Sequence, residues 1–472
     1  MHQSPRNLKA LNLLGIALTG AGKLEQANSR FEEALGIDPH FYPARKNLAV
    51  NDFTLNRHAE SATQFERVLK DSPADDVAHV YLGELCFEKK QWDAAAAHYR
   101  KSPQRIARNR SWTLHYAECL LQQKSLLQDA TGVLDLLAND DGEGRFQAGL
   151  LLGQHEAFQP AAGFFAAAAE AGYSDRYTAG YNQVLMLTRA AQYADAIRIS
   201  EELLRQGFRR AELYNLVSES YSKTGRIQEA YDALRTATKI EPRAEDNYAD
   251  LVALCLDHEN YPLALDILDV GGHYLPNSYR LHVLRGVTLV MKGLLDEAEK
   301  EFYTASKMAP DRTLPYIALA EVWMQTGQPQ KAVDILRPRL THGESDYLTP
   351  YIFAAAVVRS GAALDSPVAN QAVDALKGSI RANPDFSHSR AALGKLLLGR
   401  GDVDGAITQL ELAVKLDASD ATPAYQLVQA YRKKGEAAKA RQMLARVAAM
   451  HAEERELDFK KDLKRLVRTE AR

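Results

Sequence analysis

The chain has 472 residues and a formal net charge of −3, so its composition gives no global attraction to nucleic acid or to an anionic membrane. It contains no run of about 18 apolar residues, which argues against a membrane-spanning helix, and its first residues lack the apolar core of a signal peptide. Cys86, Cys119 and Cys255 are widely spaced and odd in number, so we expect buried free thiols and a reducing cytoplasm.

The segment from Leu8 to Pro39 predicts two short helices that face each other. Its first half carries apolar residues at helical spacing, namely Leu11, Leu14 and Leu18. Gly22 can take the left-handed conformation that ends the first helix, and Pro39 stops the second. Neither helix has enough apolar surface to be stable alone in water, so we expect this unit to stack on copies of itself.

Copies of this unit recur along the chain, mostly at a spacing of 34 residues. The most regular column holds a small residue where the second helix crosses the first, and it is Ala in twelve cases and Ser in one: Ala27, Ser61, Ala95, Ala130, Ala161, Ala196, Ala230, Ala264, Ala298, Ala332, Ala372, Ala406 and Ala440. The period and the columns resemble the tetratricopeptide repeat (TPR), a helix–turn–helix unit of 34 residues. The resemblance covers nearly the whole chain, as about 13 tandem repeats.

The resemblance implies an all-α fold, a right-handed superhelix built as an α-solenoid. The repeat pattern predicts units 1–4 over residues 8–141 and units 5–13 over residues 142–451, with a boundary at the breaker cluster 139–144. A charged segment with apolar residues on one helical face, 452–472, is expected to be a C-terminal capping helix. Residues 1–7 are either a disordered lead or the remnant of a further repeat. In the second case a periplasmic location is possible instead of a cytoplasmic one.

In similar proteins the first helix of each repeat lines a concave groove that holds a peptide or a helix. The inward positions of the middle repeats predict a partner-binding surface formed by Tyr181, Leu185, Asn215, Glu219, Val283, Val287, Val290, Met291, Ile317, Glu321 and Met324. An exposed apolar strip usually marks a binding surface. The alternative is that neighbouring first helices bury much of this strip against each other.

A cluster of basic residues joins repeats three and four. It comprises Arg100, Lys101, Arg105, Arg108 and Arg110. Such a run is usually a solvated rim, but it could contact an acidic partner, in which case the interaction would weaken with added salt.

The sequence contains no phosphate-binding loop, zinc-binding helix motif or CxxC pair, so we expect neither an enzyme nor a cofactor. The sequence therefore favours a bacterial non-catalytic scaffold that binds a protein segment and is a monomer or a weak homo-oligomer. Two alternatives remain open: a substrate-recruiting arm of a larger enzyme, for example a glycosyltransferase, and an assembly factor of the cell envelope or of secretion.

Overall fold

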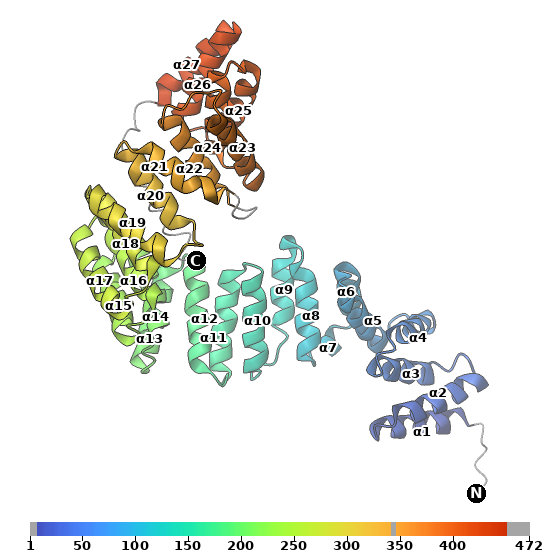
Figure 1. Ribbon diagram of the computed structural model, residues 1–472. Coiled ribbons are helices and arrows are strands. Elements are labelled where there is room, and N and C mark those ends of the chain that lie inside the picture. Colours follow the sequence, from blue (N-terminus) through green and yellow to red (C-terminus); the bar gives the residue numbers. More distant parts are fainter. Residues whose placement is uncertain (1–6, 341–345, 451–472) are drawn as a thin grey trace. The chain divides into compact units, whose positions relative to one another are not determined.

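The computed structural model describes residues 7–340 and 346–450, which form 27 α-helices, two short 3₁₀ helices and no β-strand (Figure 1). All of the α-helices except α7 (Pro103–Ile106) pair as the first and second helix of a repeat. The predicted all-α solenoid of about 13 repeats is therefore confirmed. The predicted capping helix at 452–472 lies outside the described residues.

The chain divides into two compact units, residues 1–230 and residues 231–472. Unit 1 contains α1 (Leu8–Gly20), α2 (Leu24–Ile37), α3 (Tyr42–Thr54), α4 (His58–Asp71), α5 (Asp76–Glu88), α6 (Trp92–Tyr99), α7, α8 (Arg110–Leu121), α9 (Leu127–Leu134), α10 (Gly142–Gln154), α11 (Phe158–Glu170), α12 (Arg176–Arg189), α13 (Tyr193–Arg205) and α14 (Ala211–Lys223). The division falls within α15 (Ile227–Ile240).

Unit 2 continues with the same alternation of first and second helices. It contains α16 (Glu245–Asp257), α17 (Tyr261–Tyr274), α18 (Tyr279–Lys292), α19 (Leu295–Met308), α20 (Leu314–Gln325), α21 (Pro329–Leu336), α22 (Leu348–Arg359), α23 (Pro367–Ala382), α24 (Ser387–Gly399), α25 (Val403–Leu416), α26 (Ala421–Lys434) and α27 (Ala437–Met450). Around the breaker segment 139–144, one hydrophobic cluster includes Leu134, Leu137, Phe146 and Ala148. A boundary at that segment stays a prediction.

The small residues of the crossing column are buried in every repeat. Twelve of the thirteen have no exposed surface, and Ala440 is 4% exposed. The one hydroxyl in the column is satisfied, because Ser61 Oγ donates a hydrogen bond of 2.8 Å to the carbonyl oxygen of Ala49. A larger side chain at any of these positions would push the second helix away from the first.

A second close contact joins the two helices of a repeat where glycine in the first helix faces an aromatic ring in the second. Gly15 faces Phe31, Gly83 faces Tyr99, and Gly286 faces Phe302, where a Cβ on the glycine would lie 2.4 Å from the ring. All three rings are fully buried. The ring therefore fills the space that the missing side chain leaves.

Adjacent repeats are joined by hydrogen bonds from the start of one first helix to the end of the preceding repeat. The hydroxyl of Tyr248 donates to the carbonyl oxygen of Pro242 at 2.9 Å, and Nε of Arg390 donates to that of Pro384 at 3.1 Å. In these two cases the proline that ends one repeat presents a carbonyl which the next repeat satisfies.

The three cysteines are free thiols, as the sequence predicts. Cys119 and Cys255 are buried, whereas Cys86 is half-buried. Burial raises the pKa of Cys119 to about 12 and that of Cys255 to about 11, so both thiols stay protonated at neutral pH.

The Gly149→Ala substitution should destabilise the protein, because the new Cβ would lie 2.9 Å from the ring of Phe165 in the same repeat. We expect a loss of about 1–3 kcal/mol in the free energy of unfolding, measured by urea denaturation. Gly163→Ala is the matched control, since nothing lies within 4 Å of its Cβ and alanine favours helix. A Gly149→Ala protein as stable as the control would contradict the packing described above.

The turn between the two helices of most repeats contains a residue with a positive φ, and in several repeats this residue is not glycine. Ala191 is one of them, with φ of 57°. We expect Ala191→Gly to raise the free energy of unfolding by about 0.5–1 kcal/mol, because glycine adopts this conformation without strain. Ala167→Gly, inside helix α11, should instead lower it by about 1 kcal/mol. Thermal unfolding of both variants measures whether Ala191→Gly is more stable than the wild type and Ala167→Gly less stable.

Candidate partner-binding surfaces

The inward face of the first helices is open in three consecutive repeats of unit 1. The open positions are the ninth residue of each repeat, carried by α10, α12 and α14, and the fifth residue in α12 and α14. The fifth residue in α10 is Phe146, which is only 8% exposed. Leu150 is 41% exposed, Tyr181, Leu185 and Asn215 are half-buried, and Glu219 is exposed. Four of these five residues belong to the surface that the sequence predicts. Together these residues place apolar side chains and one carboxylate on the corresponding faces of three helices.

Tyr181 is held in place by an aromatic cluster beneath it. Its ring centroid lies 5.9 Å from that of Tyr177, which lies 5.4 Å from that of Phe208. The hydroxyl of Tyr177 donates to Glu212 at 3.0 Å, and the guanidinium of Arg210 lies 4.1 Å from the Tyr177 ring centroid. Burial raises the pKa of Tyr181 above its ordinary value, so the phenol is neutral at physiological pH. The ring is therefore a fixed, uncharged part of the surface.

The corresponding face is closed in repeats eight to ten of unit 2. The sequence predicts that an apolar strip is exposed here. This prediction of exposure is wrong, because the residues of the strip are only 1–5% exposed: Val283, Val287, Val290, Met291, Ile317 and Met324. Helix α18 packs against both α16 and α20, so successive first helices cover one another's apolar residues. Glu321 on the same face is half-buried. A partner-binding role for these residues stays a prediction.

Two of the five basic residues between repeats three and four form ion pairs within the chain. Nε of Arg105 donates to Asp76 at 2.8 Å, and Arg110 donates two hydrogen bonds to Asp141. These contacts lower the pKa of both carboxyl groups below the ordinary value. Arg100, Lys101 and Arg108 are exposed. Contact between this cluster and an acidic partner stays a prediction.

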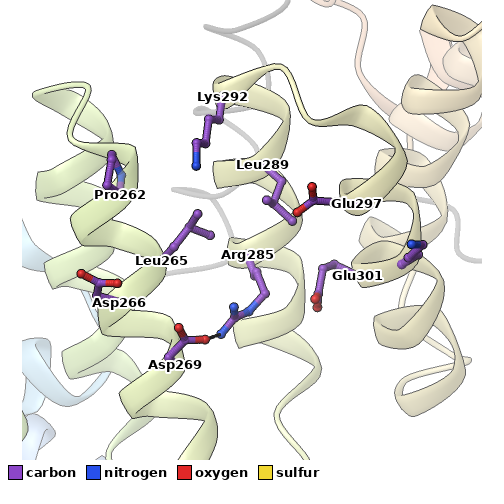
Figure 2. A pocket seen from close by; sticks show the side chains of 10 residues that line it. Pro262, Leu265, Asp266, Asp269, Arg285, Leu289, Lys292, Glu297 and Glu301 are labelled. Carbon is purple, nitrogen blue, oxygen red and sulfur yellow. Dashed lines mark hydrogen bonds and ion pairs between the residues drawn. The ribbon is translucent and has the colours of Figure 1, made fainter.

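A groove of about 550 Å³ opens between the second helices α17 and α19, and α18 forms its floor (Figure 2). Figure 2 shows Arg285, Leu289 and Lys292 on α18 between side chains of α17 and side chains of α19. The remaining lining residues are Pro262, Leu265, Asp266 and Asp269 on α17, and Glu297, Lys300 and Glu301 on α19. This groove is not part of the surface that the sequence predicts.

One ion pair and one histidine–carboxylate contact lie along this groove. Arg285 donates to Asp269 at 2.5 Å, and Nδ1 of His282 lies 2.6 Å from Glu301. A smaller cavity of about 200 Å³ adjoins the groove, and Arg285 lines both. Arg285 therefore lies where a charged groove meets a largely apolar pocket.

Within the part of the chain that the structure describes, no three His, Cys, Asp or Glu side chains are grouped as metal ligands. Over the same residues, no helix has the length and apolar character needed to cross a membrane.

Family models described as tetratricopeptide repeat match residues 46–109, 369–421 and 211–243. The comparison with curated proteins finds no match. Similar solved structures include the APC/C hetero-tetramer Cut9–Hcn1, at 14% identity over 98% of this chain and 96% of that one, with a TM-score of 0.41. Yeast Tom70 is similar at 15% identity over 98% and 95%, with a TM-score of 0.41. MamA from Desulfovibrio magneticus RS-1 is similar at 16% identity over 36% and 94%, with a TM-score of 0.32.

The Arg110→Gln substitution should lower stability at neutral pH by about 0.5–1 kcal/mol, since this ion pair is partly exposed. Because Arg110 depresses the pKa of Asp141, the stabilisation is full above the ordinary carboxyl pKa of about 4 and is lost as the pH falls through the lower folded value. Thermal unfolding at pH 7 and pH 3 measures this. Arg108→Gln is the control, and an Arg110 effect that persists unchanged at pH 3 would contradict the assignment.

Proposed function

The chain is a tetratricopeptide-repeat protein, and we propose that it acts as a non-catalytic scaffold that binds a segment of a partner protein on unit 1. The observation that carries this proposal is the open first-helix face of α10, α12 and α14, where Leu150 is 41% exposed and Tyr181 and Leu185 are half-buried. Apolar side chains held at this exposure on a rigid array are typical of an interaction surface.

The spacing of these residues supports docking of an extended or helical segment. Leu150, Leu185 and Glu219 occupy the same position in three successive repeats, so a segment crossing the three helices meets two apolar side chains and then a carboxylate. Peptide recognition on helical surfaces commonly uses regularly spaced apolar anchors and polar groups that fix orientation. A segment with two apolar residues followed by a basic one fits this order.

The buried strip of unit 2 supports this choice of surface. Val287 and Ile317 are 1% and 3% exposed, so a partner would find almost no apolar area there without opening the helices. Substituting either residue with a charged one would disturb the packing of α18 and α20. Such a variant could therefore not separate a loss of partner binding from a loss of stability. We therefore assign the principal contact to the open face of unit 1.

The Leu150→Glu substitution tests this assignment. The side chain is exposed, so we expect the fold to survive, while the new charge should weaken partner capture by at least about tenfold through loss of apolar contact. Crosslinking capture from a lysate of the source organism, with quantitative mass spectrometry, measures each partner.

Leu136→Glu is the matched control, because Leu136 is also 41% exposed and lies after α9, a second helix. Partners lost with Leu150→Glu and retained with Leu136→Glu support the proposed face. Partners retained equally by both variants would overturn it, provided that circular dichroism shows both variants folded.

A further inference from the structure

The junction of repeats eight and nine departs from the chain's own repeat pattern at one position. The seventh residue of a repeat packs toward the preceding second helix, and it is leucine in most repeats. In the described part of the chain the following are at most 6% exposed: Leu48, Leu82, Leu251, Leu319, Leu393 and Leu427. In repeat nine this residue is Arg285, the only charged side chain in the column, and its side chain is 24% exposed.

On one side of Arg285 the neighbouring residues would pack better against an apolar side chain than against a guanidinium group. The smaller cavity beside it is lined by Leu268, Leu275, Pro276 and Leu281, and Gly272 leaves this side open. A leucine at this position would enter that cavity and bury apolar surface, as its equivalents do in other repeats. The arginine instead keeps the junction open, so packing within the chain does not explain its presence.

The guanidinium group of Arg285 uses only part of its hydrogen-bonding capacity within the protein. Asp269 accepts from one guanidinium nitrogen, and its own side chain is 67% exposed. A guanidinium carries five N–H donors arranged to hold a carboxylate in two parallel hydrogen bonds. Figure 2 shows Arg285 between Asp269 on α17 and the side chains of α19, within the groove. A second carboxylate approaching through the groove would meet donors that the chain leaves available.

The remaining charges limit what can bind. Lys292 and Lys300 border the groove, but so do Asp266, Glu297 and Glu301. A polyanion such as a nucleic acid or a polyphosphate would be repelled by these carboxylates at several points. A single carboxylate meets less of this repulsion, and its attraction to Arg285, Lys292 and Lys300 opposes what remains. The adjoining apolar cavity then accepts a neighbouring apolar side chain.

From these observations we propose that the groove between α17 and α19 binds a partner peptide segment in which an aspartate or glutamate adjoins an apolar residue. The carboxylate pairs with Arg285, and the apolar side chain fills the cavity lined by Leu268, Leu275 and Leu281. This surface belongs to the second-helix side of unit 2, so it does not depend on the first-helix surface proposed for unit 1.

The Arg285→Leu substitution separates binding from folding, because it restores the residue found at this position in other repeats. We expect the melting temperature of the full chain to stay the same or to rise. Arg381→Leu, at an exposed site on α23, is the matched control for removing an arginine. A melting temperature lowered by Arg285→Leu but not by Arg381→Leu would overturn the proposal, since Arg285 would then be structural.

Binding is measured with a displayed library of random twelve-residue peptides, selected on the wild-type chain and counted again on each variant. We expect enrichment of sequences with Asp or Glu beside an apolar residue, and a loss of at least about tenfold in their recovery on Arg285→Leu. Recovery should be unchanged on Arg381→Leu and on Leu150→Glu, which distinguishes this site from the one on unit 1. No such enrichment, equal recovery on Arg285→Leu, or full displacement of the peptides by millimolar inorganic phosphate would overturn the proposal.

Discussion

The whole array depends on the close approach of the second helix of each repeat to its first, which only a small side chain at the crossing allows. The thirteen residues at this crossing are alanine or serine, and twelve of them have no exposed surface. Neither helix of a repeat is stable alone, so each pair must form this contact before it can stack on its neighbours. Pairs such as Gly286 and Phe302 extend the same contact further along the two helices.

Because these contacts lie inside the repeat, they leave other positions free to differ between repeats. The ninth residue of a repeat is open at Leu150 and Leu185 in unit 1 and closed at Val287 in unit 2. Successive first helices are in contact in both units, α12 with α14 in unit 1 and α18 with α16 and α20 in unit 2, so this contact alone does not set the exposure. One repeat pattern thus includes an open face in one unit and a buried layer in the other.

Arg285 illustrates how a repeat protein can change the surface of one junction without changing its fold. One charged residue in a column that is leucine in seven of the thirteen repeats, together with Gly272 opposite it, leaves a groove and a cavity at a single junction. The repeats on either side keep their buried leucines, Leu251 and Leu319. A site of this kind is visible as a local departure from the chain's internal consensus, and the aligned columns of the sequence contain that signal.

The sequence by itself determined the all-α class, the helix–turn–helix period and the crossing residues, because these depend on contacts between residues close in the chain. It also indicated that the strip containing Val287 and Ile317 is apolar, but it left open whether water or another helix covers it. Only the tertiary structure decided this, since burial there depends on how closely α16, α18 and α20 pack across repeats. The groove beside Arg285 likewise required the structure, because its walls come from three helices whose spacing no local pattern specifies.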